Sequence, residues 1–304
     1  MPTIQSPACD VVAGAPSEAW LAAARALAAV GESADPRPLV GLDPNSTVLR
    51  AGNHVGKVSG VVGLEAQFLT KALAAIHARL APFGLAPHLS VLQVLPCGVL
   101  QVYQYIAPSG DHVWFGSGRA LAQAHRLLAG IRPSTGWPWV GFYGESFEFR
   151  AIVPAITDAD TREACLRLLP FCARSPSPDP AQYVHRDASP ANTIPLPGGR
   201  ACLIDWDMAH PGLPVDDLAM AVCMISDRES ASLEEASEQF VAGYRAEVPY
   251  DWADLEHPSF RAALALAGLR QAGAGWFSDL GDSGAPYWEH VRRRTQAALQ
   301  LITL

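Results

Sequence analysis

Apolar and polar positions in the first third of the chain alternate in short runs that predict a small β-sheet accompanied by helices. Residues 17–30 are predicted to form a helix, because Ser17 is a favourable N-cap, strong helix formers follow it and Gly31 comes directly after. Amphipathic spacing predicts a second helix over 64–80. Short β-rich runs between turn-forming residues predict strands over 39–42, 47–50, 54–58, 89–95 and 99–106.

Beyond residue 106 the hydrophobic pattern becomes mainly helical. An irregular aromatic stretch, a proline-rich loop and two short β segments interrupt it. The fold class is therefore α+β with a bilobal organisation: residues 1–106 form an N-terminal lobe with a small antiparallel sheet plus helix, and residues 107–304 form a mainly helical C-terminal lobe. Helices of this second lobe are predicted over 118–129, 161–173, 215–226, 231–245, 258–274 and 285–302.

Composition and charge exclude several classes of protein. Of the 304 residues 49% are hydrophobic, so the chain can bury a sizeable core. It has no apolar run of about 18 or more residues and no signal-peptide pattern at its N-terminus, so we expect a cytoplasmic protein without a membrane partner. The net charge of −8 disfavours nucleic acid as a partner. The six cysteines lack metal-type spacing and are interpreted as reduced thiols, and the oligomeric state is left open.

Three polar residues with suggestive spacing lie in the segments 183–192 and 203–207. Asp187 and Asn192 are five positions apart, and Asp205 follows 18 positions after Asp187, at the end of an apolar run. A carboxylate can accept a hydroxyl proton, whereas an amide oxygen and a second carboxylate are suitable ligands for Mg²⁺. This is the equipment of phosphoryl transfer. Asp207 is a weaker candidate for a metal or substrate contact.

Two charged residues upstream fit the same chemistry. Lys57 lies in a predicted strand and Glu65 at the start of the next predicted helix, an arrangement in which an ion pair can direct an ammonium group at phosphates. Each has a simpler interpretation. Lys57 would otherwise be an exposed lysine on an edge strand, and Glu65 an acid favoured by the helix dipole.

Taken together, the motifs resemble those of the aminoglycoside phosphotransferase and choline kinase group of protein-kinase-like enzymes. They are His185-Arg-Asp-Ala-Ser-Pro-Ala-Asn192, Leu203-Ile-Asp-Trp-Asp207 and the segment 212–219, with Leu121-Ala-Gln-Ala-His125 before them. The resemblance implies a bilobal protein-kinase-like fold, Mg²⁺, and transfer of a γ-phosphoryl group from ATP or GTP to a hydroxyl of a small molecule. It covers the chain from about residue 47 to residue 219.

The resemblance also implies roles for single residues of the catalytic region. Asp187 takes the role of catalytic base, and Asn192 and Asp205 those of the metal ligands. Lys57 contacts the nucleotide phosphates with Glu65 as its partner. By the same comparison Asp217 is structural and braces the catalytic loop, and His125 packs beneath that loop.

For the nucleotide, the resemblance points to two further segments. The turn Asn45-Ser46-Thr47 resembles the short turn over the phosphates, which makes Ser46 a candidate contact. Residues 103–106 fit the strand joining the lobes, where the backbone of Gln104 and Ile106 would bind the purine. A bulky Tyr103 at the back of that pocket would disfavour adenine and favour GTP; a tyrosine that only fills the core is the alternative.

Departures from the family pattern concern two positions. Arg186 stands where small-molecule kinases of this group usually have glycine, and Gly56 precedes Lys57 where a bulky apolar residue is usual. In addition, only 12 positions separate Asp205 from Asp217. This is too short for an activation loop and a peptide-docking platform, so the acceptor is expected to be a small molecule and not a protein.

Candidate acceptor residues lie in two regions, where aromatic rings can stack on sugars or bases and carboxylates can contact amines. The first region is the aromatic stretch within residues 137–149, and the second directly follows the helix predicted over 258–274. The candidates are Trp137, Trp139, Tyr143, Glu145, Trp276 and Asp279, together with Asp207.

The function predicted from the motifs is that of a Mg²⁺-dependent small-molecule O-phosphotransferase. The resemblance further implies that it inactivates an aminoglycoside-like or other hydroxylated antibiotic as a resistance mechanism. A metabolite kinase for an amino alcohol or a sugar is the close alternative within the same fold. An alternative of another class, a nucleotide-binding pseudokinase or regulatory module, is disfavoured because every catalytic position is filled.

Overall fold

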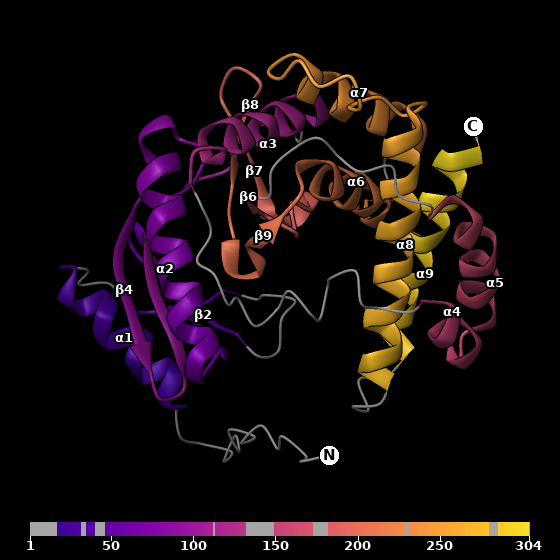
Figure 1. The fold of residues 1–304 in the computed structure, drawn as a ribbon. Helices are drawn as coiled ribbons and strands as arrows, with labels where there is room; N and C mark the ends of the chain where they lie inside the picture. The colour runs from indigo at the N-terminus through magenta and orange to yellow at the C-terminus, as the bar shows by residue number, and fades with distance from the viewer. Residues whose placement is uncertain are drawn as a thin grey trace. The chain divides into compact units, whose positions relative to one another are not determined.

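A computed structural model describes residues 17–31, 35–39, 46–111, 113–131, 149–172, 182–228, 232–279 and 285–303 (Figure 1). The chain divides into two compact units. Unit 1 comprises Met1–Ala74 and His88–Ile106, and unit 2 comprises Ala75–Pro87 and Ala107–Leu304. Residues 75–87, which the sequence placed in the N-terminal lobe, therefore cluster with unit 2.

Unit 1 contains a five-stranded antiparallel sheet with the order β1-β2-β3-β5-β4. The first predicted strand differs, because pairing is found at residues 37–38, whereas residues 40–42 lie outside the described part of the chain. The strands are β1 (Arg37–Pro38), β2 (Ser46–Ala51), β3 (His54–Ser59), β4 (Leu89–Leu95) and β5 (Gly98–Gln104).

Helix α1 (Glu18–Ala29) packs on one face of this sheet and forms the core of unit 1 with it. Ser17 caps the helix by accepting a hydrogen bond from the Trp20 N–H at 3.1 Å. The contact with β3 is close: a Cβ on Gly56 would lie 3.2 Å from Cγ of Leu27. This explains why residue 56 is glycine. Because side chains alternate along a strand, Lys57 points to the sheet face opposite α1.

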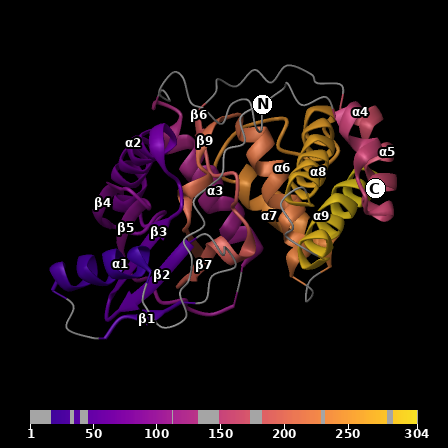
Figure 2. The same cartoon turned by 90° about the horizontal axis from the view of Figure 1, so that it is seen from below.

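Unit 2 is mainly helical, with two antiparallel strand pairs, β6 with β9 and β7 with β8. In both views α8 and α9 lie side by side and α5 lies along α9 (Figure 1 and Figure 2). The elements are α3 (Trp114–Leu128), α4 (Phe149–Ile152), α5 (Ala159–Leu168), β6 (Gln182–Val184), β7 (Thr193–Leu196), β8 (Arg200–Leu203), β9 (His210–Gly212), α6 (Pro214–Met224), α7 (Leu233–Arg245), α8 (Pro258–Asp279) and α9 (Ala285–Thr303), preceded by α2 (Gly63–Leu80), which begins in unit 1.

Three predicted helix boundaries in unit 2 are wrong by more than two residues. Helix α8 runs to Asp279 and not to residue 274, and the other two have identifiable physical reasons. Helix α3 begins at Trp114 and not at residue 118. Its residues Gly116 and Gly118 lie inside the helix, at positions where another part of the backbone packs too closely for a side chain. A Cβ on Gly118 would lie 1.9 Å from the carbonyl oxygen of Phe240 in α7. Helix α5 ends at Leu168, since Pro170 favours the 3₁₀ turn that follows. Within the described ranges, no helix combines the length and the apolar character needed to cross a membrane.

Candidate active site

The catalytic loop runs from His185 to Asn192 and is held at both ends by short strand pairs. Strand β6, which leads into the loop, pairs with β9, so that Val184 lies opposite His210. The loop ends in the 3₁₀ turn Pro190–Asn192 and continues into β7, which pairs with β8. The Ile204 N–H donates to the carbonyl oxygen of Asn192 at 2.9 Å. The two motif segments of the sequence are therefore brought side by side within unit 2.

Asp217, in the first turn of α6, fixes the start of the loop by hydrogen bonds to its backbone. Its carboxylate is fully buried and accepts hydrogen bonds from the backbone N–H of His185 at 2.8 Å and of Arg186 at 2.7 Å. His125 of α3 contacts the same carboxylate at 2.9 Å and Tyr244 Oη at 2.7 Å. Burial favours the protonated acid, but the bonds from His125 and the loop outweigh it and lower the pKa of Asp217 to about 2. Asp217 thus stays ionised and braces the loop.

Arg186 has a left-handed backbone, with φ of 66°. An L-residue pays roughly 1–2 kcal/mol for this conformation, whereas glycine adopts it readily. This accounts for the glycine that related small-molecule kinases usually have here. In this chain Arg186 is also buried, and its charge contributes to lowering the pKa of the neighbouring His210.

His185 links the two motif segments and is not placed as a proton shuttle. Its Nε2 donates to the carbonyl oxygen of Ile204 at 2.9 Å, and its Nδ1 accepts from the Asp187 N–H at 3.2 Å, which assigns the neutral tautomer. The ring is fully buried and packs against Trp206 at a centroid distance of 4.3 Å. Burial lowers the pKa of His185, which agrees with a neutral structural role.

Asp187 and Asn192 face each other inside the loop. The Asn192 Nδ2 donates to the carbonyl oxygen of Asp187 at 3.0 Å and to its Oδ2 at 2.8 Å. This orientation turns the amide oxygen of Asn192 away from Asp187. Burial, opposed by the charge of Arg294 and reinforced by that of Asp205, raises the pKa of Asp187 to about 6. A base with a pKa near neutrality is well matched to accepting a hydroxyl proton.

Asp205 follows β8 and precedes the 3₁₀ turn Trp206–Met208, with a left-handed φ of 61° that aspartate tolerates better than most residues. The buried Trp206 anchors this turn by donating its Nε1–H to the carbonyl oxygen of Leu203 at 3.2 Å. Asp207 lies in the same turn and is half-buried. Among the described residues, no group of three or more His, Cys, Asp or Glu is placed to hold a metal. The assignment of Asn192 and Asp205 as metal ligands stays a prediction, based on the preference of Mg²⁺ for oxygen donors of this kind.

The candidate nucleotide residues belong to unit 1. Lys57 is buried in β3, opposite Val48 of β2 and Gln101 of β5. On the same sheet face, the Tyr103 hydroxyl donates to Oε1 of Gln101. Glu65 lies in the first turn of α2 and is half-buried, as is Ile106. Gln104, at the end of β5, is exposed. Ser46 begins β2, and its side chain lies outside the described part of the chain.

The structure leaves most candidate acceptor residues outside its description. Trp137, Trp139, Tyr143 and Glu145 fall within residues 132–148, and only the backbone of Trp276 and Asp279 in α8 is described. Conversely, sequence reasoning missed Arg294 and Asp227, whose charges act on Asp187. No local signal could have found them, because 67 positions separate these two residues in the chain.

Comparison with known proteins gives one family match and a set of similar solved structures. Residues 107–257 match the model of the phosphotransferase enzyme family, APH. No similar sequence is found among curated proteins. Similar solved structures include a choline/ethanolamine kinase family protein from Mesorhizobium loti (TM-score 0.60, 18% identity, 90% of each chain covered). They also include a microcompartment-associated aminopropanol kinase, with a TM-score of 0.62, 18% identity and coverage of 92% of this chain and 96% of that chain. A third is an amicoumacin kinase in complex with AMP-PNP, Ca²⁺ and Ami, with a TM-score of 0.62, 14% identity and coverage of 91% of this chain and 92% of that chain.

These likenesses establish the α+β, protein-kinase-like fold expected from the sequence. Residues 107–257 belong to the APH phosphotransferase enzyme family, which identifies this part of the chain as a phosphotransferase.

Proposed function

We propose that the protein transfers the γ-phosphoryl group of a nucleoside triphosphate to a hydroxyl of a small molecule in a Mg²⁺-dependent reaction. The observation that carries the proposal is the arrangement of Asp187, whose pKa is raised to about 6, beside an Asn192 amide oxygen turned away from it. Both are held in a loop that Asp217 fixes through two backbone N–H groups. Such preorganisation is what phosphoryl transfer requires of a protein.

In the proposed reaction Asp187 accepts the proton of the acceptor hydroxyl. The acceptor oxygen forms a bond to the γ-phosphorus, the bond from the γ-phosphorus to the bridging oxygen breaks, and a nucleoside diphosphate leaves. Asn192 and Asp205 hold Mg²⁺, which when bound neutralises negative charge on the phosphates. Asp207 is kept as a candidate contact with metal or acceptor.

The nucleotide is assigned to the lobe formed by residues 1–106, and the catalytic and acceptor residues to 107–304. In this proposal Lys57, paired with Glu65, and Ser46 contact the phosphates, and the backbone of Gln104 and Ile106 binds the purine. The AMP-PNP and divalent cation bound by the amicoumacin kinase support a nucleotide donor. Comparing turnover with ATP and GTP in Tyr103→Met tests the donor base: the GTP hypothesis predicts a shift towards ATP, and an unchanged preference removes it.

For the acceptor we propose a hydroxylated antibiotic, modified as a resistance mechanism and bound against residues 137–145 and the end of α8. The amicoumacin kinase supports this choice. A metabolite kinase for an amino alcohol is the second candidate, supported by the likeness to the aminopropanol kinase at the same TM-score of 0.62. A nucleotide-binding module without activity is the third.

One screen separates the three candidates. Wild-type protein and Asp187→Ala are incubated with MgATP or MgGTP and a panel of aminoglycosides, amicoumacin, peptide and nucleoside antibiotics, choline, ethanolamine and aminopropanol. ADP or GDP release is measured, and the new phosphate is located by mass spectrometry and NMR. The proposal expects an antibiotic to be phosphorylated by the wild type only. Turnover of an amino alcohol alone overturns the resistance function, and nucleotide binding without any turnover in either protein indicates a binding module.

A further inference from the structure

The side chain of Arg50, near the end of β2, stacks on the ring of Tyr105, the residue that directly follows β5. The guanidinium carbon of Arg50 lies 3.5 Å from the centroid of that ring. Its Nε donates to the carbonyl oxygen of Gly52 at 3.1 Å, in the turn between β2 and β3. Because the face of an aromatic ring attracts a cation, the contact holds residue 105 against this turn.

The same turn also holds the backbone of Tyr105. The Tyr105 N–H donates to the carbonyl oxygen of Asn53 at 2.6 Å, and the N–H of the preceding Gln104 donates to the carbonyl oxygen of His88 at 3.0 Å. Tyr105 is therefore fixed to the turn both by its ring and by its backbone. We call Arg50, Asn53 and Tyr105 the Arg50 clamp.

The Arg50 clamp lies within the segment of unit 1 to which the nucleotide base is assigned. In the proposed function the backbone of Gln104 and Ile106 binds the purine, and Tyr105 is the residue between them. By the register of β2 against β3, Arg50 also lies on the same face of the sheet as Lys57. The clamp therefore holds the middle residue of the proposed purine-binding segment.

Holding this segment in place has a consequence for ligand affinity. Strand β5 ends at Gln104, so the residues after it are not part of the ladder between strands. A segment that is ordered only when a ligand binds loses conformational freedom at that moment, and the affinity falls accordingly. Contacts that fix the segment beforehand remove part of this cost. The clamp supplies two such contacts to Tyr105, a hydrogen bond from its backbone and a stacked guanidinium on its ring.

We propose that Arg50 is a positioning residue for the phosphoryl donor, which stacks on Tyr105 and thereby keeps the backbone of Gln104 and Ile106 in the conformation that binds the purine. The inference rests on the proposed function. It predicts a lower affinity for the nucleotide when the stack is broken and no change in kcat at saturating nucleotide. The reason is that contacts to the purine are the same before and during the transfer step.

The test is a double-mutant cycle of Arg50→Met, Tyr105→Leu and the variant with both changes. Tyr105→Phe keeps the aromatic face and is one control. Arg37→Met is the other, because Arg37 is exposed on β1 directly opposite Arg50 and does not stack on Tyr105. Calorimetry measures the Kd for MgADP, MgGDP, adenosine and guanosine, and steady-state kinetics with an acceptor from the panel measures kcat and the KM for the nucleotide.

Each single variant is expected to bind its preferred nucleotide about three- to tenfold more weakly than the wild type, which is the effect of losing a cation–π contact. The double variant should be no weaker than the weaker single variant, since both changes break one contact. Tyr105→Phe and Arg37→Met should stay within about twofold of the wild type. The nucleoside should lose the same factor as the nucleotide, because the clamp acts on the purine, and kcat should change by less than about twofold.

Several results would overturn the inference. They are an affinity of Arg50→Met equal to that of Arg37→Met, losses that multiply in the double variant, or a loss that spares the nucleosides and so indicates a direct contact with the phosphates. Should Arg50→Met not fold, Arg50→Lys replaces it, since lysine lacks the planar group that stacks on the ring; wild-type affinity then counts against the inference. A wild type that binds neither MgADP nor MgGDP instead contradicts the proposed function itself, and the two failures are therefore distinguishable.

Discussion

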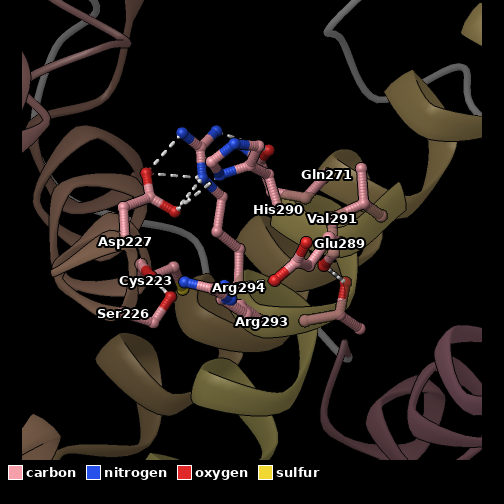
Figure 3. A network of polar contacts seen from close by, with 10 residues as sticks. Cys223, Ser226, Asp227, Gln271, Glu289, His290, Val291, Arg293 and Arg294 are labelled. Atoms are coloured by element: carbon pink, nitrogen blue, oxygen red, sulfur yellow. Dashed lines mark hydrogen bonds and ion pairs between the residues drawn. The ribbon is translucent and has the colours of Figure 1, made fainter. Parts of the chain in front are cut away.

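The catalytic loop can be compared with the group formed by Arg294, Asp227, Gln271 and His290, which we call the Arg294 cluster (Figure 3). Both hold a charged side chain by hydrogen bonds on more than one edge, but they are built in opposite ways. The loop is assembled from short strand pairs around residues 182–212, and its anchor Asp217 is fully buried. The cluster joins residues from three separate helical elements, and its anchor Asp227 keeps 18% of its side-chain surface exposed. The comparison predicts a larger loss of stability from changes at Asp217 than from changes at Asp227.

The largest effect is expected at the centre of the loop. Asp187→Asn should lower kcat by about 10²–10⁴-fold, because it removes the group that accepts the hydroxyl proton. The change is nearly isosteric and leaves Asp217 and His185 in place, so the melting temperature and the Kd for MgADP should stay close to those of the wild type. Steady-state kinetics measures kcat, and calorimetry measures the melting temperature and the Kd for MgADP. A variant that retains full turnover would show that Asp187 is not the base.

The anchor of the loop should matter more for stability than for nucleotide binding. Asp217→Ala leaves the backbone N–H groups of His185 and Arg186 and the buried His125 without their acceptor, at a cost of about 3–5 kcal/mol of unfolding free energy. Urea unfolding monitored by circular dichroism measures this cost. Asp160→Asn, at an exposed acid in the first turn of α5, is the control and should change the unfolding free energy by less than about 1 kcal/mol. Equal effects of the two changes would contradict the role of Asp217 as a buried brace.

A third prediction concerns pH and His210, which lies opposite Val184 at the entry to the loop. Burial, assisted by the charge of Arg186, lowers the pKa of His210 from 6.5 to about 4. Its folded pKa is therefore below its unfolded pKa, so its contribution to stability is fully present above pH 6.5 and is lost as the pH falls towards 4. The loss amounts to about 3 kcal/mol across this window.

Urea unfolding of the wild type and His210→Asn between pH 7 and pH 4 tests this expectation. The asparagine cannot take up a proton, so the pH dependence of its unfolding free energy should be smaller. Part of the dependence should remain, because burial also lowers the pKa of His185. Parallel curves for the two proteins would contradict the assignment to His210.

The contrast between the two regions also explains what the sequence could predict. The loop could be recognised from the sequence because its candidate residues lie within the short segments 185–192 and 203–219. There the spacing of the polar residues itself indicates the chemistry. The left-handed backbone of Arg186 could not be predicted, because an arginine in a sequence does not indicate a positive φ. The close-contact role of Gly118 was likewise hidden, because the carbonyl oxygen that it meets belongs to Phe240 in another helix. The Arg294 cluster depends on how α6, α8 and α9 pack, which no local pattern encodes.

The smallest effect on stability is expected at the anchor of the Arg294 cluster. Asp227→Asn weakens the pairing with Arg294, but both side chains remain partly in contact with solvent, so the cost should be about 1 kcal/mol or less of unfolding free energy. Urea unfolding compares this variant directly with Asp217→Ala. A loss of stability as large as that of Asp217→Ala would contradict the difference between a buried anchor and a partly exposed one.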